Sequence, residues 1–162
     1  MLLKEISTVM HQFKYAVRTK CGRRQAWEVY TNVENWRSFA NIYGEMQWGQ
    51  GNPWEVGSRL DIQILYPVEV VIDHTIILCE PRRGLGWIDR ALGVTISQWV
   101  MFDDDPGGGT RVVTEGEVFS HGIKIAGKPV EYLVEIFTET WYENFRAACD
   151  QSFEANSCPT MV

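Results

Sequence analysis

The stretch PVEYLVEIFTETWYENFRAACD, residues 129–150, carries the one long amphipathic pattern in this chain of 162 residues. Its apolar side chains recur at intervals of three and four residues, which is the spacing of one helical face. They are Val130, Leu133, Val134, Phe137, Trp141 and Phe145. The pattern predicts a helix of about five to six turns. No period continues beyond it, so we expect one domain at residues 1–150 and a flexible tail at residues 151–162.

A different pattern precedes this helix. Residues 9–18 alternate between apolar and polar side chains, as in a half-buried strand. Two short helical patterns follow, and Asn32 separates them as a capping residue. From residue 45 to residue 119, short alternating runs are joined by turn sequences such as PRRG and DDDPGGG. These runs indicate an antiparallel meander of about six further strands.

The order of these elements predicts an α+β fold with two short helices after the first strand. One long helix has to cover the apolar face of an antiparallel sheet of about six to seven strands. A curved sheet that grips a single helix commonly leaves an apolar hollow beside that helix, where small molecules bind. We therefore expect an internal ligand cavity between the sheet and the C-terminal helix.

Four short motifs, in this order along residues 12–149, resemble those of the START superfamily, also called SRPBCC or birch-pollen-allergen-like proteins. AWEVYTNVENW resembles its pair of short helices, and NPWEVGSRL resembles the start of one of its strands. CEPRRGLGW and GGGTRVVTEGE resemble two of its turn-and-strand motifs. The likeness is to the polyketide cyclase/dehydrase-like branch. It implies a helix-grip fold, in which a curved sheet wraps a long C-terminal helix, with an apolar ligand cavity.

One histidine interrupts the apolar face of a predicted strand, VVIDHTIILCEP, residues 70–81. His74 shares that face with four aliphatic residues. The plainer interpretation is a core histidine bonded to a neighbouring side chain or to water. The alternative is a ligand contact or an acid–base group, because imidazole titrates near neutral pH. Tyr66, on the apolar face of the preceding strand, is the other catalytic candidate.

Other side chains on the inward faces are candidates for ligand binding. We expect the more apolar face of residues 94–102 to point inward, and Gln98 with it. The opposite parity would turn Trp99 inward instead, since a shift of one residue exchanges the faces. Asp89 shares a face with Trp87, although a position near the strand end would leave its carboxylate in water. For the aromatic and aliphatic candidates, plain core packing is the alternative. The predicted set is Tyr15, Trp36, Tyr66, His74, Trp87, Asp89, Gln98, Val134, Phe137 and Trp141.

The composition argues against several partners. The net charge is −6 and the 15 basic residues are scattered, so nucleic acid and anionic membranes are poor candidates. No apolar run approaches the length of a membrane span, and no signal peptide is expected. The three histidines lack the spacing of metal ligands, and no motif calls for a cofactor. The four scattered cysteines indicate reduced thiols in a cytoplasmic protein. A homodimer is compatible with the sequence.

Two functions fit these features. The first is a carrier or sensor that binds a hydrophobic small molecule, such as a lipid, an isoprenoid or a polyketide-like aromatic. The second is an enzyme of the aromatase/cyclase type, which would use His74 or Tyr66 for proton transfer during aldol cyclisation and dehydration. The sequence shows no dense cluster of catalytic side chains, so binding is the favoured function.

Overall fold

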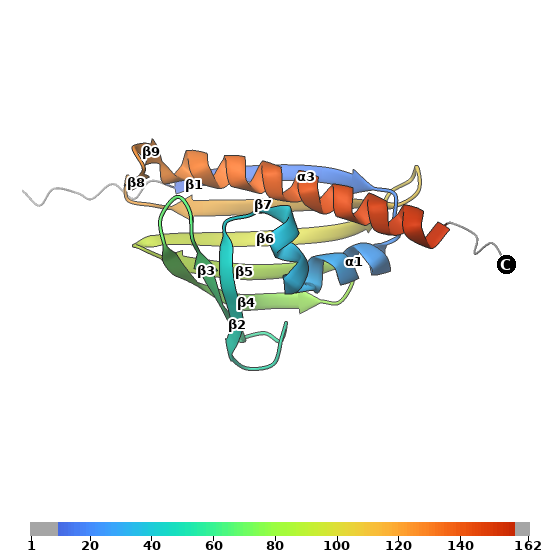
Figure 1. The fold of residues 1–162 in the computed structure, drawn as a ribbon, viewed down its shortest axis with the longest axis horizontal. Coiled ribbons are helices and arrows are strands. Elements are labelled where there is room, and N and C mark those ends of the chain that lie inside the picture. The colour runs from blue at the N-terminus through green and yellow to red at the C-terminus, as the bar shows by residue number, and fades with distance from the viewer. Residues whose placement is uncertain (1–9, 158–162) are drawn as a thin grey trace, which may run out of the picture.

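Figure 1 shows the fold as a computed structural model, which describes residues 10–157. The elements in chain order are β1 (Met10–Thr19), α1 (Arg23–Thr31), η1 (Val33–Asn35), α2 (Trp36–Phe39), β2 (Tyr43–Gln50), β3 (Arg59–Ile64), β4 (Val70–Glu80), β5 (Gly84–Ala91), β6 (Val94–Asp104), β7 (Thr110–Phe119), β8 (Lys124–Ile125), β9 (Lys128–Pro129) and α3 (Val130–Ser157). This is the predicted α+β, helix-grip arrangement, with a long C-terminal helix and two short helices after the first strand.

Seven strands form one antiparallel sheet in the order β1-β7-β6-β5-β4-β3-β2. From β2 to β7 each strand pairs with the next one in sequence, which confirms the predicted meander. β1 pairs with β7 along its whole length, from Met10 opposite Phe119 to Thr19 opposite Thr110. The two edges of the sheet are therefore β1 and β2, and α3 runs beside β1 (Figure 1).

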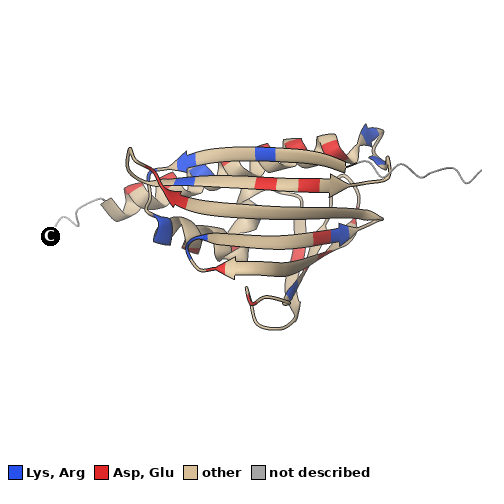
Figure 2. Cartoon of the chain, turned by 180° about the vertical axis from the view of Figure 1, so that it is seen from behind, with Lys and Arg blue, Asp and Glu red and all other residues tan. Residues whose placement is uncertain are grey.

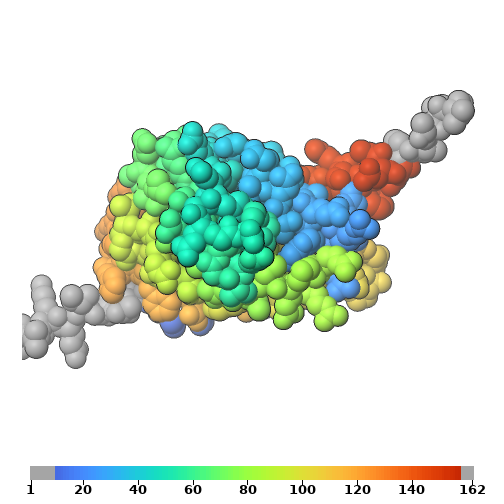
Figure 3. Space-filling model, turned by 90° about the horizontal axis from the view of Figure 1, so that it is seen from below, coloured from blue at the N-terminus to red at the C-terminus, as the bar shows by residue number. Residues whose placement is uncertain are grey.

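The short helices are linked as the sequence predicts. Asn32 ends α1, and its side-chain oxygen accepts a hydrogen bond from the backbone N–H of Glu34 at 3.2 Å. Trp36 begins α2, and its indole N–H donates to the backbone oxygen of Tyr30 at 2.8 Å. Figure 3 shows the segment around β2 and the β2–β3 loop beside these helices. Trp54, in that loop, donates its indole N–H to the backbone oxygen of Thr31 at 3.0 Å.

α3 is longer than predicted. It continues past Asp150 to Ser157, so the predicted boundary at residue 150 is too early. Two contacts hold the added turns against α1 and the segment that precedes it. Gln25 donates to Ser152 Oγ at 2.7 Å, and Lys20 pairs with Glu154 at 2.8 Å. Residues 158–162 of the predicted tail lie outside the described residues.

The strand pattern leaves two features unassigned. β2 begins at Tyr43, two residues before residue 45, from which the alternating runs are predicted. β8 and β9 have two residues each, which is too short for any alternation to be visible. Within residues 10–157, no helix combines the length and the apolar character that a membrane crossing requires.

The parity of β6 agrees with the prediction. Val100 and Phe102 are buried, whereas Trp99 and Met101 are exposed on the outer face of the sheet. Gln98 therefore lies on the inner side, two residues from Val100. Figure 2 shows the outer face, where β6 carries charged residues only near one end.

Aromatic rings fill the middle of the layer between the sheet and α3. The ring of Tyr30 lies 5.1 Å from that of Trp141 and 5.4 Å from those of Phe102 and Phe145. These four side chains are at most 5% exposed. A smaller cluster around Val118 packs nearer the start of α3. Rings thus occupy the space in which the sequence predicts an open hollow.

We expect Phe145→Ala to lower the free energy of unfolding by about 3–5 kcal/mol, because it leaves a cavity in a packed interior. Phe145 is fully buried and contacts Tyr30, Phe39 and Trp141. Urea unfolding followed by circular dichroism measures the change. Ile136→Ala, on the exposed side of the same helix, is the matched control and should stay within about 0.5 kcal/mol. A loss below about 1 kcal/mol at Phe145 would contradict a packed interior.

Candidate functional site

β4 and β5 bring a histidine and a carboxylate together on the inner face of the sheet. Their antiparallel register places His74 directly opposite Asp89, and His74 Nδ1 lies 2.6 Å from Asp89 Oδ1. Trp87 lies two residues before Asp89, on the same face of β5. Its indole N–H donates to Asp89 Oδ2 at 3.0 Å. Each oxygen of the carboxylate therefore has a partner, and the His74 ring is held in one orientation.

The second nitrogen of this imidazole has no partner. His74 is 3% exposed, and its Nε2 atom is buried without a hydrogen bond. Buried polar atoms are almost always bonded, and an unsatisfied one costs about 1–3 kcal/mol. The rings of Trp87 and Trp36 flank the imidazole, at centroid distances of 5.1 and 5.9 Å. This free nitrogen between two indoles is the strongest candidate contact for a ligand in the described residues.

α3 adds one more aromatic ring, that of Trp141, to the rings around His74. Trp141 is buried, and its ring centroid lies 5.8 Å from that of Trp36. Phe137 is half-buried and lies 6.2 Å from Tyr43, which is itself 6.2 Å from Trp36. Val134 packs in the smaller cluster around Val118 instead. The structure therefore brings Trp36, His74, Trp87, Asp89 and Trp141 together, with Phe137 at the margin and Val134 apart.

A second polar group lies among the aromatic rings. The hydroxyls of Tyr30 and Tyr142 are 2.9 Å apart, and Gln98 donates its amide to Thr114 Oγ1 at 2.8 Å. The Tyr142 hydroxyl also contacts both Gln98 and Thr114, which links the four side chains. Burial raises the pKa of Tyr142 to about 12 and lifts the pKa of Tyr30 well above its ordinary value. Both phenols are therefore neutral at physiological pH and can act as hydrogen-bond donors.

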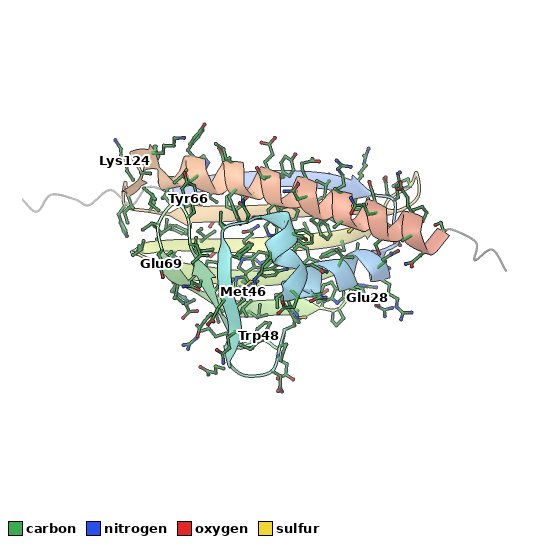
Figure 4. The ribbon with its side chains drawn as sticks, viewed as in Figure 1. Glu28, Met46, Trp48, Tyr66, Glu69 and Lys124 are labelled. Carbon is green, nitrogen blue, oxygen red and sulfur yellow. The ribbon has the colours of Figure 1, made fainter. Side chains whose placement is uncertain are left out.

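Tyr15 and Tyr66 lie outside the group around His74, although Tyr15 is half-buried against the main core. Tyr15 donates its hydroxyl to Glu143 Oε1 at 2.8 Å, a bond that joins β1 to α3 and raises the pKa of Tyr15 to about 12. Tyr66 is 70% exposed and lies in the β3–β4 loop (Figure 4). β3 ends at Ile64, so the alternation that assigns Tyr66 an inward direction no longer applies at that position. The placement of Tyr66 on the inner face is wrong.

Sequence reasoning misses part of the site. Tyr30 and Tyr142 come from α1 and α3, and no local pattern indicates that their hydroxyls meet. The pairing of His74 with Asp89 depends on the strand register, which alternation alone does not give. The available signal is positional: Asp89 shares a face with Trp87, and a buried carboxylate there needs a partner. That partner is His74, so Asp89 is not simply a strand-end residue in water.

Two hollows on the molecule lie elsewhere. One is on the outer face of the sheet, between Trp99 and Gly116. The other is near the start of α3, beside His11 and Ile123. Neither is lined by His74 or by the rings around it. Because His74 is buried and two indoles flank its ring, a ligand that comes from solvent reaches Nε2 only if a surrounding side chain moves.

Neither a scan against protein-family models nor a search of curated proteins finds a match to this sequence. Solved structures do match in fold. The Zhui aromatase/cyclase from Streptomyces sp. R1128 superposes with a TM-score of 0.76 at 13% identity, over 92% of this chain and 99% of that one.

Two further structures match over most of the chain. Ara h 8.0201 has a TM-score of 0.71 at 9% identity, over 87% of this chain and 98% of that one. A protein from Rhizobium leguminosarum has a TM-score of 0.68 at 17% identity, over 90% of this chain and 97% of that one. At such low identity the likeness shows the fold. The chain has the helix-grip fold, in agreement with the START/SRPBCC superfamily that its motifs resemble.

Proposed function

We propose that this protein binds an apolar, ring-containing small molecule between the sheet and α3, with His74 as its polar contact. The observation that carries the proposal is the buried, unpaired Nε2 atom of His74, held in place by Asp89. The indole of Trp87 beside the imidazole offers a flat apolar surface, which suits a planar ligand. The helix-grip fold supports the proposal because such folds commonly hold ligands in this layer.

The ring most able to move aside is that of Trp36. Trp87 lies on β5, which is paired on both sides, and its indole is bonded to Asp89. The Trp36 indole is also bonded, to the backbone oxygen of Tyr30, but Trp36 lies on α2, a helix of four residues, and packs against Trp54 of the β2–β3 loop. We propose that a ligand reaches His74 by displacing Trp36, so that ligand surface replaces indole surface beside the imidazole.

A cytoplasmic location is part of this proposal. Cys21, Cys79 and Cys149 are all free thiols in the structure, as is usual in a reducing compartment. The ligand would then be a cytoplasmic lipid, isoprenoid or polyketide-like aromatic, carried or sensed by the protein.

A second candidate function is acid–base catalysis of the aromatase/cyclase type. The specific observation in its favour is the Asp89–His74 pair, in which the carboxylate orients the ring and Nε2 is free to accept a proton. Nε2 would remove a proton from the carbon between two carbonyls, the enolate would attack a further carbonyl to form the new C–C bond, and the ring would return the proton to the resulting alkoxide. In the dehydration, Nε2 would remove the second proton from the same carbon and pass it to the departing hydroxyl, which leaves as water. The fold likeness to an aromatase/cyclase supports this candidate.

We expect native mass spectrometry of the purified protein to detect a bound apolar molecule. His74→Phe should reduce its occupancy and weaken its binding about tenfold, which corresponds to the loss of one hydrogen bond. Tyr66→Phe, in the exposed loop, and His121→Gln, an exposed histidine, are the matched controls and should retain the ligand. Equal ligand occupancy in His74→Phe and in the controls would contradict the proposed role of His74.

The catalytic candidate is tested with a synthetic poly-β-ketone thioester, whose cyclised and dehydrated products are separated by liquid chromatography and identified by mass. If the protein is a cyclase, His74→Gln should lower turnover by about 10²-fold or more while substrate binding persists. Tyr66→Phe should leave turnover unchanged. Wild-type turnover no faster than the reaction in buffer would reject the catalytic candidate and leave the binding function.

A further inference from the structure

We infer that the ligand presents a hydroxyl group to His74, and that Asp89 and Trp87 determine this preference by fixing which nitrogen of the imidazole carries hydrogen. The inference rests on the proposed binding function and narrows its ligand class to apolar ring compounds with an alcohol, phenol or enol O–H. It follows from the direction of the hydrogen bonds around the imidazole, one bond at a time.

The first step is the direction of the His74–Asp89 bond. An ionised carboxylate has only acceptor atoms. Asp89 Oδ2 accepts from the indole N–H of Trp87 at 3.0 Å, and Oδ1 lies 2.6 Å from His74 Nδ1. Nδ1 must therefore carry the hydrogen of this bond. In the neutral ring the other nitrogen, Nε2, is then a lone-pair acceptor.

The second step is that the neighbouring indoles cannot supply the missing hydrogen. The N–H of Trp36 donates to the backbone oxygen of Tyr30 at 2.8 Å, and the N–H of Trp87 donates to Asp89. Leu60, directly opposite His74 on β3, is fully buried and has no polar side-chain atom. The donor that satisfies Nε2 therefore has to come from outside these residues.

The third step concerns which ligands this nitrogen rejects. A ketone, an ether or a carboxylate would turn an oxygen lone pair toward the lone pair of Nε2, and neither atom would gain a hydrogen bond. A hydroxyl at the same position donates a hydrogen bond to Nε2, which replaces the hydrogen bond that it donates to water before binding. Sites built around one buried polar atom discriminate strongly against ligands that leave it unpaired.

The test compares two probes of nearly equal shape, 2-naphthol and 2-methoxynaphthalene, by isothermal titration calorimetry at about pH 8. The wild type should bind 2-naphthol at least about tenfold more tightly than 2-methoxynaphthalene. The same ratio measured in His74→Phe corrects for the different water affinity of the two probes, and there the preference should vanish.

The Asp89→Asn variant should reverse the preference of His74 Nε2 from hydroxyl ligands to ketone ligands. The indole N–H of Trp87 would hold the oxygen of the new amide, which leaves the amide NH₂ to donate to His74 Nδ1. The ring hydrogen then moves to Nε2, which becomes a donor. This variant should lose its preference for 2-naphthol and bind 2-acetylnaphthalene, a ketone, more tightly than the wild type does. Thermal unfolding of each variant checks that it is folded.

A measurement without any ligand tests the same inference. The ¹⁵N chemical shift of His74 Nε2 should be that of a bare ring nitrogen in the wild type and that of an N–H nitrogen in Asp89→Asn. An N–H signal at Nε2 in the wild type at about pH 8 would overturn the inference.

The outcomes distinguish a failure of the hydroxyl preference from a failure of the proposed binding function. Equal binding of the two probes, or a wild-type preference for 2-methoxynaphthalene, overturns the hydroxyl inference while the binding function stands. If none of the three naphthalene probes binds and native mass spectrometry finds no bound molecule, the proposed function itself fails.

Discussion

The cross-strand pairing of His74 with Asp89 is the constraint on which the site depends. It exists because β4 and β5 pair in one register, and a slip of one strand by a single residue would turn its side chain to the outer face, away from the partner. Both strands are interior members of the sheet, bonded to neighbours on each side. The imidazole is therefore oriented by rigid elements rather than by loops, which is what a defined ligand contact requires.

The aromatic interior makes ligand binding and the stability of the fold compete. Trp36 packs beside the imidazole and also contacts Tyr30 and Trp141, so ligand binding competes with ring packing. Stability and binding then draw on the same apolar surface, because each ring that a ligand displaces loses contacts that the ligand has to replace. The fold alone does not choose between a carrier and an enzyme. The choice depends on whether His74 Nε2 only accepts a hydrogen bond from the ligand or also removes a proton from it.

Periodicity predicted much of this architecture. The spacing of the apolar residues indicated α3, Asn32 marked the break between the short helices, and the more apolar face of residues 94–102 was correctly placed inward. These are local properties, because the 3.6-residue and two-residue periods are visible within one element. The end of an element is less visible. Tyr66 was assigned inward because the alternation of apolar and polar residues continues in the sequence beyond Ile64, where β3 ends.

The chemistry of the site was harder to predict because it lies in contacts between elements. His74 stood out as the one polar residue on the apolar face of its own strand, yet its partner became visible only with the strand register. The contact between Tyr30 and Tyr142 joins α1 to α3, and the last turns of α3 are held by side chains near α1. Such pairings follow from three-dimensional packing, which no single-segment pattern encodes.

The most direct test of the account is a crystal structure of the protein with its co-purified ligand or with bound 2-naphthol. The account predicts a ligand oxygen within about 3 Å of His74 Nε2, and Trp36 displaced from its position beside the imidazole. A ligand bound only on the outer surface, with Nε2 bonded to a single ordered water and the rings around it unmoved, would contradict it.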